Sequence, residues 1–362
     1  MKIVTVVGAR PQFIKAAVVS RQVRKIHREI LVHTGQHYDY NMSERFFDEL
    51  DIPRPDYNLG ISGGTHAEMT GRMLIELEKV LVKERPDALL VYGDTNSTLA
   101  AALAAAKLHI PVCHVEAGTR THSMTNPEEL NRICTDHLST LLIACTKPNL
   151  DNLVRENLAE RSLLVGDPML DAFVMYSQKA DRMPHILTCL DGHQREIPEQ
   201  FFYLTCHREE NTQDDAVLKQ ILCAMEQLEH PVIYPVHPRN KERAARICTA
   251  SGFHNVILTE PVGYLTSVYL TNHAEKIVTD SGGLQREAFF AEKKCVTVLN
   301  FEVWPETMVD GRNELSSPET QSILKALSNP QHVDETYRPF GDGRASPKIV
   351  SALERLEHSL KS

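Results

Sequence analysis

Short apolar runs separated by amphipathic segments are the dominant pattern along the chain. The first half contains KIVTVV, EILVHT, ALLVYG, PVCHVE and LLIACT, and a stretch with helical periodicity follows each run. A second series begins near Phe201 with FFYLTC, VIYPV, NVILTE and KIVTD. Apolar strands that alternate with helices are typical of parallel sheets covered by helices on both faces. The pattern predicts an α/β protein built from two successive units of similar size.

The length supports the same division. A chain of 362 residues is longer than one hydrophobic core usually organises. The polar segment from about Ala180 to Pro198 contains two prolines and is interpreted as the connection between the units. We therefore expect an N-terminal domain over 1–170 and a C-terminal domain over 171–346, and we expect a last helix, 347–362, to pack back on the first domain.

Composition restricts the class of protein and of ligand. The net charge of −9 argues against a nucleic-acid surface, and no apolar run approaches the roughly 20 residues that span a bilayer. No export signal is visible at the N-terminus. The eight cysteines are scattered without CxxC pairs, which fits a reducing cytoplasm and does not fit a zinc site. We expect a cytoplasmic protein that binds no nucleic acid, membrane or metal.

The segment TDSGGLQREA predicts a phosphate-binding turn. An apolar strand runs into Ser281, Gly282 and Gly283, which open a helix. The glycines let the backbone approach an anion, and the N–H groups at the helix start point towards it. Glu287, one helical turn later, is placed to accept hydrogen bonds from ribose hydroxyls. A plain capped helix is the alternative interpretation.

Basic residues follow the first strand in GARPQFIK. Arg10 and Lys15 flank the first helical turn, where they are suited to clamp a diphosphate. The segment has neither the GxGxxG pattern of dinucleotide-binding proteins nor a Walker lysine motif. The sequence therefore indicates neither a dinucleotide cofactor nor an ATP P-loop.

Carboxylates follow two strands and open one helix of the first half. Asp94 lies in YGDTNST, Glu116 in HVEAGTR, and Glu128 in NPEELNR together with Glu129 and Arg132. Ligands of open α/β sheets lie beyond the carboxyl ends of the strands, and clustered carboxylates split their pKa values into a donor and a base. The set predicts proton transfer. Individually, Asp94 is also suited to cap the next helix, and Glu128 to stabilise the start of its own helix.

Histidines end two strands of the second half. FFYLTC is followed by His207 and Arg208, and VIYPV by His237. A histidine in this position is suited to transfer a proton or to donate to a leaving phosphate. For His237 a helix-starting turn is an equally plain interpretation.

Eight motifs, in this order, resemble the non-hydrolysing UDP-N-acetylglucosamine 2-epimerase family over nearly the whole chain. They are GARPQFIK, VYGDTNST, HVEAGTR, PEELNR, LTCHRE, YPVHP, TDSGGLQREA and PFGDGRAS. The resemblance implies two Rossmann-like domains in a GT-B arrangement with the active site in the cleft, a homodimer, and a product, UDP-N-acetylmannosamine, used for surface polysaccharides.

The resemblance also implies a mechanism and its residues. UDP leaves C1 as the C2 proton is removed, a glycal forms, and UDP returns with protonation on the other face. The implied catalytic residues are Asp94, Glu116, Glu128 and His207. The implied residues that bind the nucleotide sugar are Arg10, Lys15, Arg132, Ser281, Gly282, Gly283 and Glu287.

Three segments depart from the common family pattern. GQHYDYNMSE, Gly35 to Glu44, replaces a segment linked with allosteric UDP-N-acetylglucosamine, GARPQ replaces GTRPE, and FEVWPETM, Phe301 to Met308, replaces TERPEA. The variants are similar to the branch that acts on modified sugars such as UDP-2,3-diacetamido-glucuronate or UDP-6-deoxy-acetamidohexoses. A 6-carboxylate would call for a basic partner, for which Arg120 and Arg312 are candidates. A plain surface position is the alternative interpretation for both arginines.

Three other functions stay open on the sequence. A GT-B glycosyltransferase shares the fold and the Ser-Gly-Gly turn, but the carboxylate cluster favours an epimerase. A non-catalytic nucleotide-sugar sensor would not need the proton-transfer groups. A hydrolysing relative, which releases UDP and free N-acetylmannosamine, differs only in the access of water to the glycal.

Overall fold

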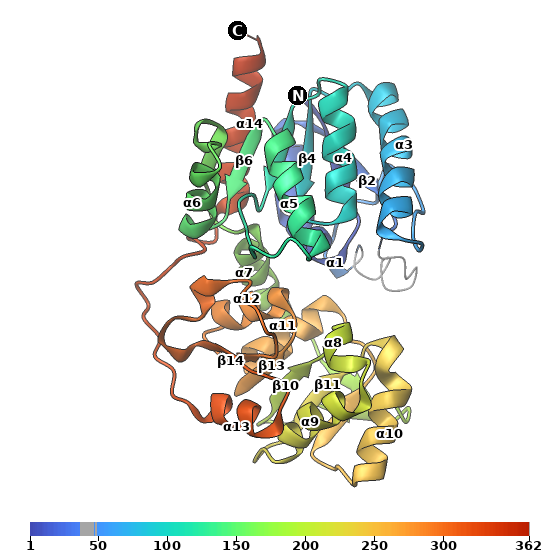
Figure 1. Ribbon diagram of the computed structural model, residues 1–362, viewed down its shortest axis with the longest axis vertical. Helices are drawn as coiled ribbons and strands as arrows, with labels where there is room; N and C mark the ends of the chain where they lie inside the picture. The colour runs from blue at the N-terminus through green and yellow to red at the C-terminus, as the bar shows by residue number, and fades with distance from the viewer. Residues whose placement is uncertain (37–46, 48, 362) are drawn as a thin grey trace. The chain divides into compact units, whose positions relative to one another are not determined.

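The chain folds into two compact units in a computed structural model that describes residues 1–36, 47 and 49–361 (Figure 1). Unit 1 comprises 1–174 and 338–362, and unit 2 comprises 175–337. Unit 1 thus extends beyond residue 170, and the chain re-enters it at Arg338 instead of residue 347. Most of the departing segment Gly35 to Glu44 lies outside the described residues.

Unit 1 contains a seven-stranded sheet with the order β3-β2-β1-β4-β5-β6-β7, in which every pairing is parallel. The strands are β1 (Lys2–Val7), β2 (Arg28–His33), β3 (Tyr57–Asn58), β4 (Ala88–Tyr92), β5 (Val112–Val115), β6 (Leu141–Ala144) and β7 (Ser162–Leu164). The chain order reverses between β1 and β4, which is the place where open α/β sheets bind ligands.

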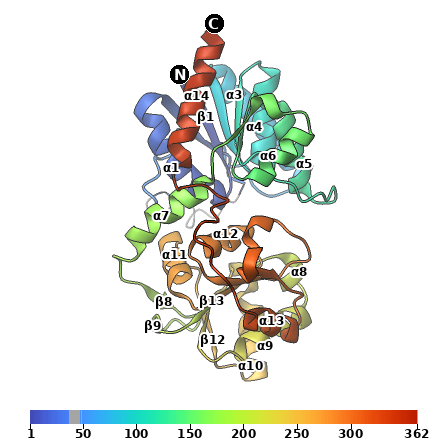
Figure 2. The same ribbon diagram turned by 90° about the vertical axis from the view of Figure 1, so that its left-hand side faces the viewer.

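Helices cover both faces of this sheet. They are α1 (Arg10–Ile26), α3 (His66–Glu84), α4 (Asn96–Lys107), α5 (Pro127–Leu138), α6 (Lys147–Arg155) and α14 (Ala345–Lys361), with the short η1 (Ala159–Arg161). A further helix, α7 (Pro168–Ala180), begins in unit 1 and ends in unit 2. Figure 2 shows α1 and α14 side by side on one face and α3 and α4 on the other. Apolar side chains of α3 and α4 pack with β1, β2 and β4 into a buried core.

The C-terminal helix is anchored in unit 1 by a buried carboxylate. Asp171 of α7 accepts hydrogen bonds from the N–H groups of Ala345, at 2.9 Å, and Ser346, at 2.7 Å. These are orphan donors of the first turn of α14, so Asp171 acts as a cap from a distant part of the chain. Residues 338–362 thereby complete the unit that the N-terminus begins.

Unit 2 contains a six-stranded parallel sheet with the order β12-β11-β10-β13-β14-β15. The strands are β10 (Phe202–Thr205), β11 (Val232–Pro235), β12 (Val256–Thr259), β13 (Lys276–Thr279), β14 (Lys294–Thr297) and β15 (Asn313–Leu315). The helices are α8 (Glu209–Thr212), α9 (Asp215–Glu226), η2 (Pro238–Asn240), α10 (Lys241–Ser251), α11 (Tyr264–His273), α12 (Gly282–Phe290), η3 (Pro305–Thr307), η4 (Val309–Gly311) and α13 (Thr320–Ser328). Separate apolar clusters fill the two faces of the sheet.

All nine apolar runs named from the sequence form strands, and the prediction of parallel α/β units is confirmed. The interpretation of 180–198 as a connection is wrong. This segment contains an antiparallel hairpin, β8 (Ile186–Thr188) and β9 (Gln194–Glu196), within unit 2. All residues of these two strands except Leu187 are exposed, so the composition of the segment resembles that of a linker. Among the described helices none is long and apolar enough to cross a membrane.

Candidate active site

Asp94 lies in the turn after β4 and is bound by residues of α5. Its Oδ2 atom lies 2.5 Å from Nη2 of Arg132, and its main-chain oxygen accepts a hydrogen bond of 2.9 Å from the Asn131 amide. The helix α4 is capped by Thr95, whose hydroxyl accepts from the N–H of Thr98. Asp94 is therefore not the cap of that helix, and its carboxylate forms an ion pair in the loop at the sheet edge.

Glu116 follows β5, the strand next to β4, and forms a buried ion pair with Lys15 of α1. The side chains of Lys15 and Glu116 are 2 % and 8 % exposed, respectively. The backbone of Glu116 has a φ of +74°, which is rare outside glycine and asparagine and costs free energy. The N–H groups of Glu116 and Ala117 both donate to the carbonyl of Ile143, which holds this conformation.

The turns that carry Asp94 and Glu116 are tied together beneath the surface by His114 and Asp136. His114 lies 2.7 Å from Asp136 through Nδ1 and 2.7 Å from the carbonyl of Gly93 through Nε2. Because both partners are acceptors, both ring nitrogens are placed as donors. Asp136 also accepts from the N–H of Gly118 at 3.0 Å. The pair thus connects the residue before Asp94 to a residue two positions after Glu116.

The ion pairs around Asp136 lower the pKa of its carboxyl group by more than burial raises it. Burial alone would raise the pKa of this carboxyl, but the charge and hydrogen bond of His114, followed by those of Arg120, hold its pKa below the usual range. Arg120 lies 2.7 Å from both Asp136 and Glu156 and is buried. The suggestion that Arg120 pairs with a sugar carboxylate is therefore wrong, because its guanidinium is engaged inside unit 1.

Two adjacent glutamates of α5 have different environments. Glu128 is exposed in the first turn, where its N–H donates to the capping side chain of Asn126. Glu129 is buried and accepts from the N–H groups of Thr121, at 3.0 Å, and His122, at 2.9 Å. Burial favours its neutral form, but these N–H groups and then Arg132 hold the pKa of Glu129 below the usual range. The structure thus assigns Glu129 to the network of Asp94 and Arg132.

Arg10 and Lys15 occupy opposite ends of the first turns of α1. The turn before Arg10 is fixed by Gln12, whose side-chain oxygen accepts from the N–H groups of Gly8 and Ala9. Arg10 is half-buried, whereas Lys15 is buried and paired with Glu116. The structure thus brings Lys15 to a candidate catalytic carboxylate.

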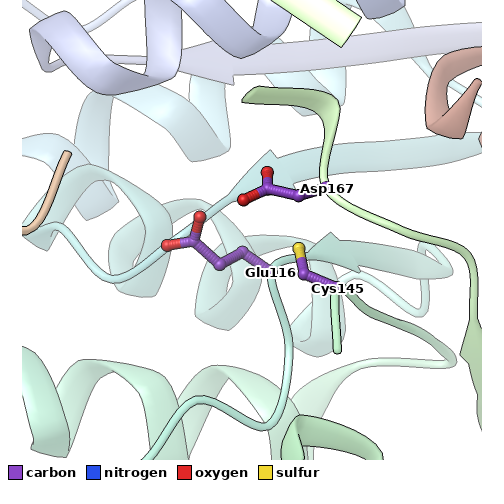
Figure 3. Close-up of side chains that lie close together, drawn as sticks. All are labelled: Glu116, Cys145 and Asp167. Atoms are coloured by element: carbon purple, nitrogen blue, oxygen red, sulfur yellow. The ribbon is translucent and has the colours of Figure 1, made fainter. Parts of the chain in front are cut away.

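Cys145 and Asp167 complete a buried cluster with Glu116 that the sequence reasoning missed (Figure 3). One donor atom of each side chain lies within 4.8 Å of the others. Cys145 directly follows β6 and Asp167 follows β7, so attention to every strand end would have found both. Three such atoms are able to bind a metal ion, but the Lys15 ammonium already pairs with Glu116, and two cations at one carboxylate repel each other.

In unit 2 the predicted Ser-Gly-Gly turn opens α12 directly after β13. Ser281 is the N-cap, and its hydroxyl accepts from the N–H of Leu284 at 3.4 Å. Gly282 and Gly283 are the first helical residues, whose N–H groups have no acceptor within a helix. A side chain at Gly282 would point towards Trp304, with its Cβ 3.6 Å from the indole nitrogen. The turn therefore has the geometry of an anion site.

His207, after β10, is oriented by Asp280, the residue that directly follows β13. Nδ1 of His207 lies 2.9 Å from Oδ1 of Asp280, which is 1 % exposed. Asp280 also accepts from the N–H of Arg208 at 2.9 Å. Burial alone would raise the pKa of Asp280, but the hydrogen bond and charge of His207 and these N–H groups hold it below the usual range. Asp280 lies within TDSGG, and its place after a buried strand was the signal for it.

Glu287, His237 and Arg312 of unit 2 have other partners. Glu287 is buried in α12 and accepts a hydrogen bond of 2.9 Å from the hydroxyl of Tyr264. His237 starts η2, and its Nδ1 accepts from the N–H of Arg239 at 3.3 Å, which supports the helix-starting interpretation. Arg312 is buried and donates to the carbonyl of Phe289, so it also is not a partner for a sugar carboxylate.

Comparisons with known proteins agree with this arrangement. The family profile described as UDP-N-acetylglucosamine 2-epimerase matches residues 21–354. A UDP-N-acetylglucosamine 2-epimerase homolog of Methanococcus maripaludis is 44% identical over 361 residues, 98% of this chain and 100% of that protein. The UDP-2,3-diacetamido-2,3-dideoxy-D-glucuronate 2-epimerase of Pseudomonas aeruginosa is also 44% identical, over 98% of this chain and 100% of its own length.

A solved structure extends the similarity to three dimensions. The crystal structure of the Methanocaldococcus jannaschii UDP-GlcNAc 2-epimerase in complex with UDP-GlcNAc and UDP has a TM-score of 0.86 and 37% identity. The match covers 98% of this chain and 100% of that one. On the extent of these matches, the chain belongs to the UDP-N-acetylglucosamine 2-epimerase family.

Proposed function

We propose that the protein interconverts UDP-N-acetylglucosamine and UDP-N-acetylmannosamine without hydrolysis. The observation that carries the proposal is the pair of carboxylates at neighbouring strand ends, Asp94 and Glu116, each ion-paired with a cation. Two carboxyl groups of this kind are what a reaction needs when it removes a proton from one face of a carbon and returns one to the other face.

The chemistry follows from the weak acidity of the C2 proton of an acetamido sugar. Direct removal is too slow, so the bond from C1 to the diphosphate oxygen breaks as the C2 proton is transferred to a carboxylate. The products are a 2-acetamidoglucal and UDP. A proton then adds to the other face of C2 while the diphosphate oxygen returns to C1, so that atoms and charges balance without a redox cofactor.

The residues of unit 1 are suited to the proton transfers. Asp94, Glu116 and Glu128 supply carboxyl groups, and Arg132 and Lys15 stabilise the ionised forms of the first two. Arg10, at the start of α1, supplies a further cation for the diphosphate.

The residues of unit 2 are suited to bind UDP and to stabilise it as it leaves. His207 has Nδ1 engaged by Asp280, which leaves Nε2 to donate to a phosphate oxygen. The turn of Ser281, Gly282 and Gly283 presents N–H groups to the diphosphate, and Glu287 accepts hydrogen bonds from the ribose. His237 is assigned to the same group of UDP-binding residues with less support, since its ring participates in a local turn.

A modified sugar is the second candidate substrate, because the relative from Pseudomonas aeruginosa is as similar in sequence as the one from Methanococcus maripaludis. The elimination chemistry would be the same, since it involves only C1 and C2. A 3-acetamido group or a 6-carboxylate would require partners other than Arg120 and Arg312, which are both buried within their own units.

We also propose a cytoplasmic homodimer that supplies sugars for surface polysaccharides. Ile75 and Val82, seven residues apart on α3, are both more than half exposed, which suits a helix face that a second copy covers. Light scattering of the wild type and of Ile75→Lys would test the dimer, because a monomeric wild type would contradict it.

Proton NMR in D2O tests the proposed reaction. Purified protein is incubated with UDP-N-acetylglucosamine and, in parallel, with UDP-2,3-diacetamido-glucuronate. Deuterium at C2 and an intact UDP-linked manno epimer support the non-hydrolysing reaction on the substrate that shows them. Free N-acetylmannosamine would instead identify a hydrolysing enzyme. Absence of exchange with either sugar, from protein that binds UDP, would favour a glycosyltransferase or a sensor.

A further inference from the structure

The segment from Phe301 to Met308 packs against the turn that opens α12 in unit 2. The indole of Trp304 lies beside Gly282, the first residue of this helix. A Cβ atom placed on Gly282 would be 3.6 Å from Nε1 and 3.7 Å from Cδ1 of the indole. A methyl group would therefore just fill the space, and a larger side chain would displace Trp304.

Trp304 also covers Arg286 on the same face of α12. Arg286 follows Gly282 by four residues, a spacing that places two positions on one face of a helix. The guanidinium carbon of Arg286 lies 4.1 Å from the centre of the indole ring, and both residues are buried. A cation over an indole face is attracted by the ring, and more strongly where water is excluded. Trp304 thus fixes a positive charge one helical turn from Gly282.

The backbone of Trp304 is held by hydrogen bonds that include α12. Its carbonyl oxygen accepts from the hydroxyl of Thr307 at 2.8 Å and from the N–H of Thr307 at 3.0 Å. Gln285 of α12 is buried and donates to the same hydroxyl at 2.7 Å. These bonds join the segment to the helix at the residue next to Arg286, so the position of the indole is coupled to that of the helix.

A second aromatic residue of the segment contacts the loop of His207. The guanidinium carbon of Arg208 lies 5.2 Å from the centre of the Phe301 ring. Nε of Arg208 donates at 2.8 Å to the carbonyl of Asp280, the residue between β13 and the turn. The segment therefore contacts both loops of unit 2 to which we assign the diphosphate.

We propose that Trp304 is a positioning residue for the diphosphate, because it fixes the start of α12 at Gly282 and holds the Arg286 guanidinium on the same face. This inference rests on the proposed binding of UDP at the turn. The first N–H groups of a helix bind an anion best when their geometry is fixed in advance and water is kept away. The buried indole provides both conditions on its side of the turn.

Trp304→Leu tests the proposal, because leucine fills part of the space but has no ring face for Arg286. We expect UDP to bind about tenfold more weakly in calorimetry, since the turn keeps its N–H groups but loses its support. Trp304→Phe keeps a ring face and should restore the affinity to within about threefold of that of the wild type. Equal UDP affinity of Trp304→Leu and the wild type would overturn the proposal.

Phe289→Leu is the matched control. Phe289 lies near the other end of α12 and also stacks on a buried arginine, since the guanidinium carbon of Arg312 lies 3.7 Å from its ring centre. Both leucine variants lose one contact between a ring and a cation, so both should lower the melting temperature. Only Trp304→Leu should weaken UDP binding. Equal losses of affinity in the two variants would indicate a general effect of stability and contradict the positioning role.

The wild type provides a test that needs no substitution, because Trp304 is the only tryptophan of the sequence. A diphosphate at the turn places negative charge beside the indole. The tryptophan emission should therefore change with added UDP and saturate at the affinity that calorimetry measures. Constant emission from protein saturated with UDP would count against the proposal.

The same experiments separate the positioning role from the proposed function. An emission change and weaker UDP binding by Trp304→Leu, in protein that exchanges no deuterium at C2, would uphold the positioning role and refute the epimerase. An active epimerase in which Trp304→Leu leaves UDP affinity unchanged would refute the positioning role alone. Wild-type protein that does not bind UDP would refute both.

Discussion

His207 and Asp280 form a pair in which the carboxylate holds both the ring and the backbone of the histidine. Oδ1 of Asp280 lies 2.9 Å from Nδ1 of His207, and Oδ2 accepts from the N–H of His207 at 2.9 Å. The ring is therefore fixed with Nδ1 towards the protein and Nε2 available to a ligand. The same carboxylate accepts from the N–H of Arg208, so it also fixes the loop after β10.

Asp280→Asn should lower kcat by about 100-fold while changing UDP affinity much less, because an amide accepts only one of these hydrogen bonds well and leaves the ring without its orienting charge. Steady-state kinetics and calorimetric UDP titration measure the two effects. If Asp280 acts through His207, the double variant with His207→Gln will be no slower than His207→Gln alone. Additive losses would show that Asp280 acts separately.

Asp94→Asn and Glu116→Gln should each lower turnover by about 1,000-fold or more and leave UDP affinity within a few-fold. Each replacement keeps the size of the side chain but removes a base and the charge that its cation partner neutralises. Deuterium exchange at C2 measures the chemical step directly. Unfolding of both variants, without an isolated catalytic defect, would mean that the ion pairs serve stability alone.

The adjacent residues Glu128 and Glu129 provide a matched pair. Glu129→Gln should lower the free energy of unfolding by about 1–3 kcal/mol, because it weakens buried hydrogen bonds to Thr121 and His122 and the ion pair with Arg132. Glu128 is exposed, so Glu128→Gln should change stability by no more than about 0.5 kcal/mol and lower turnover instead. Urea denaturation and kinetics of both variants would show whether the roles are reversed.

Glu287→Ala should weaken UDP binding by about tenfold, which corresponds to the loss of one or two hydrogen bonds from the ribose to a carboxylate. Tyr264→Phe is the control, because it removes the hydroxyl that donates to Glu287 and keeps the carboxylate. We expect a smaller effect from this variant in calorimetry. Equal UDP affinity of wild type and Glu287→Ala would remove Glu287 from the binding site.

The fold was predictable from the sequence where strands are buried on both sides. KIVTVV and ALLVYG form β1 and β4. Both runs are apolar at nearly every position, which is typical of strands in a parallel sheet that helices cover on both faces. The two-residue strand β3 and the hairpin β8–β9 were not predicted, since edge pairs of two or three residues carry no periodicity. β14 was missed because it starts with Lys294, which is buried by donating to the carbonyl of Gly311.

Part of the candidate site was predictable from one rule, namely that catalytic and binding residues lie just after the carboxyl ends of parallel strands. It located Asp94, Glu116 and His207, and the same rule applied to every strand would have included Cys145, Asp167 and Asp280. The sequence does not show which charged side chains form ion pairs with each other. Lys15 is a candidate phosphate clamp by spacing, but in the folded unit its ammonium neutralises Glu116, 101 residues away. Such a partnership depends on the order of the strands in the sheet.

His33 makes the stability of unit 1 dependent on pH. It ends β2 and packs against Phe13, with the ring centres 5.1 Å apart. Burial lowers its pKa to about 4, and a hydrogen bond with Asn58 opposes this only in part. Unfolded histidine titrates near about 6.5, so below that pH the unfolded chain binds a proton that the folded chain excludes. Stability is therefore complete above the unfolded pKa and declines as the pH falls towards the folded pKa.

Between about pH 7.5 and pH 5 this difference should cost about 2 kcal/mol of unfolding free energy. His33→Leu should remove that part of the pH dependence, although it lowers stability at neutral pH by loss of the contact with Asn58. His358→Gln, at an exposed position of α14, should keep the full dependence and serves as the control. Urea denaturation followed over this pH range decides the matter, because equal slopes for His33→Leu and the wild type would mean that His33 takes up its proton in the folded protein.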